Sequence, residues 1–320
     1  MVKDINPSII KKRCTLLLFP LIKTLIRKDE KMRKENLHFF LGGNDLEMKT
    51  IKDLLDKQGV SYSDANLGWW NANVSSYEEE IKKVAAEGKT PVIVELATED
   101  DKGNPLMVLP DNTINIDHHN NNAGRSASIL QICDLLGVEP TRRDLLVAAN
   151  DVGMAKAMRE IGATEAEVNQ IRYQDRACQG ITPEQENQAV EALSTAKEIG
   201  GILFVTCEHS KTATILDRLD REQYPDVFMY STSDKEINFS GDGYICAKLV
   251  EKFPHPHNFS GGSGLGKKGE MAYWGGSYAD VNEAAKFVIK TNIEKQQEKS
   301  ATSQMNVAIL KALTDFKFEK

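Results

Sequence analysis

The first half of the chain alternates between short apolar runs and stretches whose apolar residues recur at helical spacing. The apolar runs predict strands at Leu37–Leu41, Val60–Tyr62, Pro91–Leu96 and Thr113–Ile116. The helical spacing predicts helices at Leu46–Leu55, Tyr77–Ala86, Ser126–Leu136 and Arg142–Ala149. Strands separated by helices imply a largely parallel α/β sheet, whose ligands bind at the carboxyl ends of the strands.

The second half begins with a polar helical stretch and then repeats the alternation of strands and helices. Residues 154–199 are expected to be helical and to connect two domains, with Thr182 and Pro183 as a helix start. Beyond them we expect strands at Ile202–Thr206, Val227–Tyr230 and Glu236–Phe239, with helices near Thr212–Leu219 and Tyr244–Phe253. The predicted order is an extension (1–31), a parallel-sheet domain (32–153), a helical connector (154–199) and a smaller α/β domain (200–320).

The predicted extension holds an apolar run, Leu16–Ile22, that follows three basic residues. Pro20 and Lys23 interrupt it, and it is far shorter than the ~20 apolar residues that span a bilayer. We therefore expect a peripheral segment without membrane contact, with Met32 as an alternative start.

Composition narrows the class of partner. The net charge is −7, with 40 basic and 47 acidic residues, which disfavours a protein that coats long duplex nucleic acid. A local basic groove for a short anionic substrate is still compatible with this balance. The five cysteines are scattered, which suits a reducing cytoplasm.

The richest chemistry lies where the strand Thr113–Ile116 runs into Asp117, His118 and His119. Such polarity at a strand end is unfavourable when buried unless something pairs with it. Four further carboxylates follow predicted strands or helices: Asp45, Glu47, Glu95 and Asp151. Oxygen donors with one or two imidazoles suit Mn²⁺ or Mg²⁺, so the sequence predicts a divalent-metal site.

These residues resemble the motifs of the DHH phosphoesterases, a family that includes RecJ-type exonucleases, nanoRNA phosphatases and cyclic-dinucleotide phosphodiesterases. The third family motif is Asp117-His118-His119, and the fourth resembles Asn150-Asp151-Val152-Gly153. The first motif corresponds to Leu41 through Glu47, and the second to Glu95. The resemblance implies a DHH domain followed by a DHH-associated C-terminal domain, and covers most of residues 36–288.

The resemblance also implies roles for the motif residues. The expected metal ligands are Asp45, Glu47, Glu95, His118 and Asp151. Glu95 would bridge two Mn²⁺ or Mg²⁺ ions, His119 would contact substrate phosphate, and Asp117 would orient the imidazoles. Such a pair of ions activates water for attack on phosphorus, so the implied function is hydrolysis of short oligonucleotides or nucleotide phosphates. We expect a cytoplasmic enzyme that can form a homodimer.

The C-terminal half offers a glycine-rich loop that resembles the phosphate-holding loop of the same family. Its candidate substrate-binding residues are Gly261, Gly262, Gly264, Lys267 and Lys268. Backbone amides beside two lysines can cradle a phosphate, although a plain turn with solvated lysines fits the same sequence. The aromatic residues Tyr62, Trp69 and Trp70 are likewise open to two interpretations, base stacking or packing.

Several positions depart from the family pattern. Leu41 stands where the first motif has a histidine, Glu47 and Glu95 replace aspartates, and the loop histidine is absent. A leucine cannot bind a metal, and each glutamate lengthens its arm by one methylene. The alternative hypothesis is therefore a catalytically degenerate relative that binds a nucleotide or metal in a regulatory role.

Overall fold

The structure, a computed structural model, describes residues 34–297 apart from 101, 120, 121 and 278. The chain forms two compact units, Met1–Ile171 and Arg172–Lys320. The predicted extension, Met32 and the last residues of the chain lie outside the described part. The three boundaries between the four predicted segments stay a prediction.

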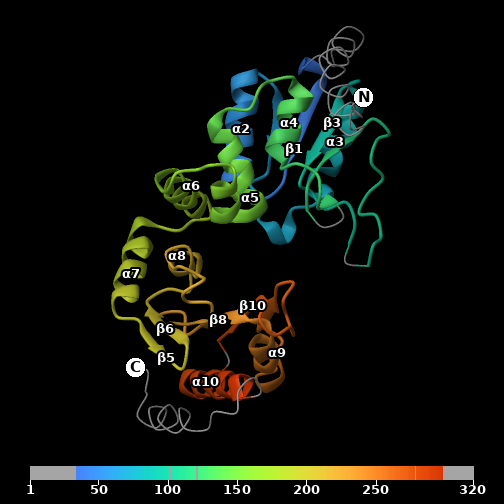
Figure 1. Cartoon of the computed structure of the whole chain (residues 1–320). Coiled ribbons are helices and arrows are strands. Elements are labelled where there is room, and N and C mark those ends of the chain that lie inside the picture. Colours follow the sequence, from blue (N-terminus) through green and yellow to red (C-terminus); the bar gives the residue numbers. More distant parts are fainter. Residues whose placement is uncertain (1–33, 101, 120–121, 278, 298–320) are drawn as a thin grey trace, which may run out of the picture. The chain divides into compact units, whose positions relative to one another are not determined.

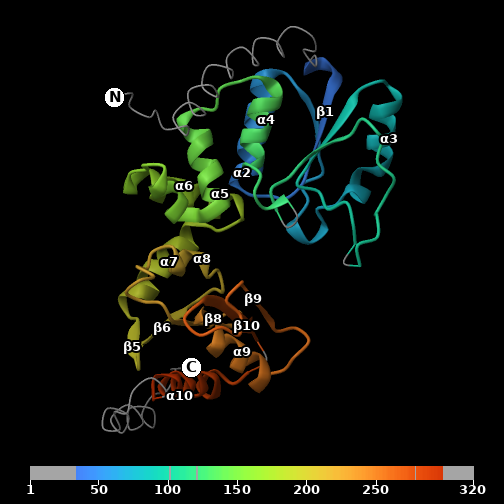
Figure 2. The same cartoon turned by 45° about the vertical axis from the view of Figure 1, so that its right-hand side comes forward.

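A four-stranded parallel sheet organises the described part of the first unit, with the strand order β2-β1-β3-β4. Its strands are β1 (Leu37–Leu41), β2 (Ser61–Asp64), β3 (Thr90–Val94) and β4 (Ile114–Ile116). The register pairs Leu41 with Val94 and Val94 with Ile116, so three strands end at one edge. The parallel α/β sheet predicted from the sequence is confirmed (Figures 1 and 2).

Alternating residues of β1 and β3 supply cores on both faces of this sheet. Phe39 and Val92 pack in one buried cluster, whereas Phe40 and Ile93 pack in another. The helices are α2 (Leu46–Gln58), α3 (Glu78–Ala86), α4 (Ser128–Leu136) and α5 (Arg142–Glu160), with 3-10 turns η1 (Lys34–Asn36), η2 (Trp69–Asn71) and η3 (Val74–Tyr77). Helices α2, α4 and α5 contact one another, and α3 packs on β3 (Figure 2).

The second unit holds a six-stranded mixed sheet in its described part, in the order β5-β6-β7-β8-β10-β9. Its strands are β5 (Lys197–Ile199), β6 (Ile202–Cys207), β7 (Val227–Ser231), β8 (Ile237–Asp242), β9 (Phe259–Gly261) and β10 (Met271–Gly276). Its helices are α7 (Pro183–Ser194), α8 (Ala213–Leu216), α9 (Gly243–Lys252) and α10 (Val281–Gln297), and α6 (Glu165–Cys178) runs across the boundary between the units. Two buried clusters cover the sheet, and the predicted second α/β unit is confirmed.

Several elements differ from the sequence prediction. Strands β5, β9 and β10 were not expected, and neither was the start of the helix α10 at Val281. Within the described residues, no helix combines the length and apolar character needed to cross a membrane.

Candidate metal centre

Glu95 is placed by an unusual backbone conformation at the end of β3. Its φ is 52°, in the left-handed region that side chains other than glycine rarely adopt. Its amide donates to the carbonyl of Ile116 at 2.9 Å, which ties it to the end of β4. Gly42 packs against it so closely that a Cβ on Gly42 would lie 2.4 Å from the Glu95 carbonyl oxygen. Strain of this kind persists where the surroundings enforce it, often at functional sites.

His118 and His119 follow β4 in a turn that Asp117 holds. One carboxylate oxygen of Asp117 accepts the His119 amide at 2.9 Å, and the other accepts the Asn122 side-chain amide at 2.8 Å. Asp117 therefore fixes the chain that carries the imidazoles. The predicted role of Asp117 in orienting the rings stays a prediction, because these contacts are with the backbone of His119 and with Asn122.

Asp151 lies on α5 just before a break in that helix. The φ of Gly153 is −159°, and that of Met154 is 52°, so the regular helix stops two residues after Asp151. A Cβ on Gly153 would meet the Ala157 side chain at 2.8 Å, which favours glycine at the break. The sequence predicted a helix through Ala149 but not this interruption.

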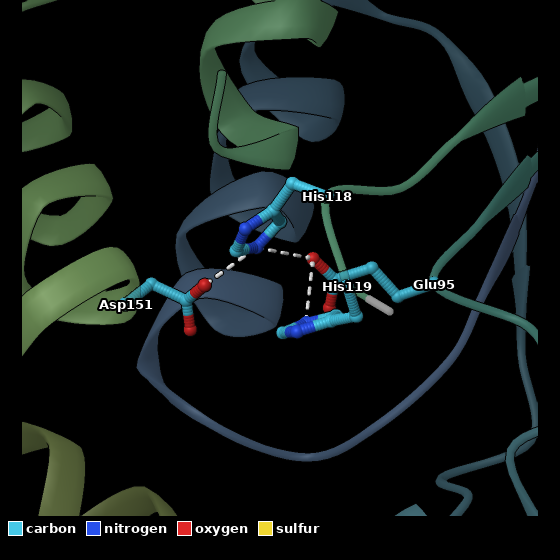
Figure 3. A group of neighbouring side chains, drawn as sticks. All are labelled: Glu95, His118, His119 and Asp151. Atoms are coloured by element: carbon cyan, nitrogen blue, oxygen red, sulfur yellow. Dashed lines mark ion pairs between the residues drawn. The ribbon is translucent and has the colours of Figure 1, made fainter. Parts of the chain in front are cut away.

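Four of these side chains converge at the sheet edge (Figure 3). Glu95, His118, His119 and Asp151 each offer a ligand atom, and these atoms lie within 4.8 Å of one another. The Nε2 atom of His118 is 2.6 Å from Oδ2 of Asp151 and 3.2 Å from Oε1 of Glu95. The same Glu95 oxygen is 3.6 Å from Nε2 of His119.

Several polar side-chain atoms of this cluster are buried and have no hydrogen-bond partner among the described residues. The atoms that lack a hydrogen-bond partner in the described chain are Oε2 of Glu47, both carboxylate oxygens of Glu95, Nε2 of His118, Nε2 of His119 and Oδ2 of Asp151. The Nε2 atom of His118 is within ion-pair distance of Asp151 and Glu95 and has no hydrogen bond to a described residue. Buried polar atoms without partners are rare, and a cation shared by Glu95, His118, His119 and Asp151 would pair with the ligand atoms of those four residues.

The electrostatics of the cluster also favour a cation. Contact with Asp151, and then with Glu47 and Glu95, raises the pKa of His118 to about 12. Contact with Glu95 also raises the pKa of His119. Burial acts to raise the pKa of Glu95, but contacts with the two histidines outweigh it and hold that pKa below its ordinary value. The surrounding carboxylates thus stabilise positive charge at the position of the imidazole nitrogens.

The other two predicted ligands, Glu47 and Asp45, lie outside this group of four. Glu47 lies beside His118, and Asp45 caps the start of α2. The Oε2 atom of Glu47 is 3.6 Å from Nε2 of His118, and its Oε1 atom accepts the amide of Ile129 at 3.0 Å. Burial raises the pKa of Glu47 well above its ordinary value. Asp45 caps α2, where its Oδ1 atom accepts the amide of Met48 at 2.8 Å. The four-residue ligand group therefore includes neither Asp45 nor Glu47.

Leu41 packs in the core of the first unit. Its side chain is buried among the residues that cover one face of the sheet, including Met48 and Ile129. Its carbonyl oxygen accepts the hydroxyl of Tyr77 at 2.7 Å. The residue that departs most from the family pattern is thus a packing residue.

The predicted phosphate loop belongs to the second unit, and several of its backbone amides already donate hydrogen bonds within that unit. The amides of Leu265, Gly266 and Lys267 donate to backbone carbonyls, and the Gly269 amide donates to Asp242. A Cβ on Gly264 would lie 2.4 Å from the Met271 carbonyl oxygen, and Gly262 has a φ of 99°.

The two loop lysines have local partners as well. Lys267 pairs with Glu270 at 3.1 Å, and the Lys268 amine lies 4.7 Å from the ring centre of Tyr244. These glycines and lysines lie together in one loop, and their role toward substrate stays a prediction.

One residue near the metal ligands was not singled out from the sequence. Ser128 begins α4, is fully buried, and contributes to the low pKa of Glu95. The next amide, that of Ile129, binds Glu47, so the start of α4 faces the carboxylates. The run Ser126-Ala127-Ser128 before an apolar helix is the pattern that could have identified it.

Comparisons with known proteins give structural similarities at low sequence identity. No family model matches the chain, and no curated protein matches it. A pGpG-specific phosphodiesterase, PggH, from Vibrio cholerae aligns with a TM-score of 0.38 and 10% identity, over 81% of this chain and 99% of that one. An exopolyphosphatase-related protein from Bacteroides fragilis aligns with a TM-score of 0.39 and 12% identity, over 82% and 93%. Four of the residues whose sequence motifs resemble those of DHH phosphoesterases, Glu95, His118, His119 and Asp151, lie together at one sheet edge.

Proposed function

We propose that the chain is a divalent-metal-dependent phosphohydrolase that acts on short oligonucleotides or nucleotide phosphates. The observation that carries the proposal is the group formed by Glu95, His118, His119 and Asp151, whose buried ligand atoms lack hydrogen-bond partners in the described chain. The resemblance of the sequence motifs to DHH phosphoesterases gives the reaction class.

The donor set favours Mn²⁺, with Mg²⁺ as the second choice. Carboxylate oxygens suit both ions, while the two imidazole nitrogens suit a transition metal better than Mg²⁺. The residues that would hold the ion are Glu95, His118, His119 and Asp151. When bound, such an ion polarises a phosphoryl oxygen and makes water more acidic.

A second ion, as the family resemblance implies, would draw on residues next to this group. Glu47 is close enough to His118 to take part, and its other oxygen is oriented by the Ile129 amide. Asp45 would contribute only if its carboxylate served the ion as well as the helix cap. Binding of two ions therefore requires ligands from outside the group of four, namely Glu47 and Asp45.

The protein's own side chains have separable tasks in this proposal. Asp117 holds the turn that presents both imidazoles. His119 is half-exposed, so it can face a phosphate as well as the ion. The loop with Lys267 and Lys268 supplies positive charge for a phosphate of the substrate.

The alternative is a protein that binds metal or nucleotide without turnover. It is favoured by one observation, the burial of Leu41 in the core where the family motif has a histidine. The two functions differ in a single measurable property, because only the enzyme releases product.

Product release from a panel of dinucleotides, short oligoribonucleotides and nucleotide phosphates, with and without Mn²⁺, tests the proposal. We expect Mn²⁺-dependent hydrolysis by the wild type and none by Asp151→Asn. His38→Ala is the matched control, because His38 bonds Ser63 away from the cluster. Absence of turnover with both Mn²⁺ and Mg²⁺ would leave the binding protein as the better description.

A further inference from the structure

An exposed tryptophan stands next to the candidate metal centre. Trp69 opens the turn η2, and 47% of its surface is exposed. Its ring lies edge-on to His119, with 5.8 Å between ring centres and 74° between the ring planes. The indole therefore neighbours the half-exposed histidine of the metal cluster, within the same unit of the chain.

Core packing does not account for this ring. The residues around it in sequence, Leu67, Ala72 and Val74, are buried in the cluster that covers one face of the sheet. Trp69 is not a member of that cluster and keeps about half of its surface in solvent. An exposed large aromatic side chain beside a polar site fits a binding role better than a structural one.

The backbone around Trp69 is tied to the strand end that carries Glu95. The amide of Ala97 donates to the carbonyl of Ala72, and the amide of Val74 donates to the carbonyl of Ala97, both at 3.0 Å. The Asn71 amide closes the turn onto Gly68. Because the turn is closed and its C-terminal side is tied to the segment after Glu95, little conformational freedom is lost when a ligand contacts the ring.

Gly43 is shaped to receive the same ring. It has a φ of 73°, and a Cβ placed on it would lie 2.4 Å from the six-membered ring of Trp69. A side chain at this position would displace the indole. Gly43 also lies between β1 and Asp45, so the ring rests on the loop within the first motif.

We propose that Trp69 is the wall on which a nucleobase of the substrate stacks, which makes the site selective for nucleotides over phosphate chains that lack a base. The inference rests on the proposed function for the identity of the substrate. Stacking of a base on an aromatic side chain contributes about 1–3 kcal/mol, or roughly a 5- to 150-fold change in affinity. Inorganic polyphosphate has no flat face and gains nothing from the indole.

The test compares ligands that differ only in the base. A non-hydrolysable adenine dinucleotide analogue and its abasic counterpart are titrated calorimetrically, with Mn²⁺ present, into the wild type and variants. We expect Trp69→Leu, which keeps apolar bulk, to weaken the adenine ligand about 5- to 150-fold and to leave the abasic ligand unchanged. Trp69→Phe should recover most of the loss, because it restores an aromatic face.

Tyr173→Ala is the matched control, since Tyr173 is an aromatic residue of similar exposure, 45%, on α6. Equal weakening of both ligands by Trp69→Leu, or weakening of neither, would overturn the inference. Hydrolysis of the unmodified abasic dinucleotide by the wild type tests the proposed function separately, because that substrate has no base to stack on Trp69. If the wild type cleaves no substrate but binds the adenine ligand in a Trp69-dependent way, the proposed hydrolase function is wrong and the stacking of a base on Trp69 is supported.

Discussion

The Nε2 atom of His118 lies 2.6 Å from the Oδ2 atom of Asp151, a residue carried by a helix that breaks two positions later. Both atoms are buried, and neither has a hydrogen bond among the described residues. The contact brings together a turn after β4 and the end of a regular helical segment. The break in α5 follows Asp151 and the turn held by Asp117 carries His118, so both features lie at the contact between these two side chains.

The first prediction concerns stabilisation of the wild type by Mn²⁺. An ion that binds only the folded state should raise the free energy of unfolding by about 2.7 kcal/mol at a hundredfold excess over its Kd. His118→Ala should abolish this increase, because it removes the ligand nearest to Asp151 and Glu95. Melting curves with and without Mn²⁺ measure it, with His38→Ala as the control. An equal Mn²⁺ response in His118→Ala would contradict the assigned ligand.

Leu41→His decides whether the missing motif histidine can be restored. Because Leu41 is packed in the core, we expect the variant to lose about 2–5 kcal/mol of stability and to gain no Mn²⁺ response. Leu41→Met, which conserves volume, should lose less than about 1.5 kcal/mol. Melting temperatures and Mn²⁺ titrations are measured together. A variant that folds well and needs less Mn²⁺ for activity would show instead that the position faces the ion.

The sequence predicts the edge of the first sheet well because the relevant physics is local. Apolar runs define the parallel strands, and their register brings Glu95 next to the end of β4. Ligands after neighbouring parallel strands then have to be close. His118 and Glu95 could therefore be grouped before any coordinates were known.

The features that escaped prediction depend on contacts between distant segments. The role of Asp45 as the cap of α2, where it accepts the amide of Met48, was not predicted from the sequence. Strands β9 and β10 contain glycines that suggest turns, whereas a Cβ on Gly275 or Gly261 would strike the ring of Phe259 or Tyr273. These glycines make room for aromatic rings across the sheet, and a pattern along one strand cannot reveal that.

The loop lysines give a prediction about substrate affinity. Lys267 is in an exposed pair with Glu270, and such pairs contribute at most about 1 kcal/mol, so a phosphate can replace the carboxylate. Changing both Lys267 and Lys268 to Ala should raise KM more than it lowers kcat, because charge-assisted contacts contribute about 1.5–3 kcal/mol each.

Glu270→Gln should have the opposite effect and lower KM, since it removes the competing carboxylate. Lys286→Ala on α10 is the matched control for loss of positive charge. Steady-state kinetics on a dinucleotide, with each variant at saturating Mn²⁺, provide the measurement. Unchanged KM values in both variants would indicate a plain turn with solvated lysines.

The last prediction concerns the acid stability of the second unit, where a buried carboxylate bridges two arginines. Glu186 on α7 accepts from Arg176 at 2.7 Å and pairs with Arg218. Burial acts to raise the pKa of Glu186, but the two guanidinium groups outweigh it and hold that pKa below its ordinary value. Since the folded pKa is lowered, the carboxylate stabilises the fold above the unfolded pKa of about 4.3, and this contribution is lost as pH falls through the folded pKa. Glu186→Gln should therefore lose about 1.5–3 kcal/mol near pH 7, because it weakens the charge-assisted contacts to Arg218 and to Arg176, which keeps Asp217 as a partner. The loss should shrink as the pH falls below about 4, where Glu186 of the wild type becomes protonated and also loses its charge.

Urea unfolding at a series of pH values measures both effects, and Glu184→Gln, an exposed neighbour on the same helix, is the control. A difference between wild type and Glu186→Gln that stays constant from neutral to acid pH would show that packing, rather than the ionised carboxylate, holds these helices together.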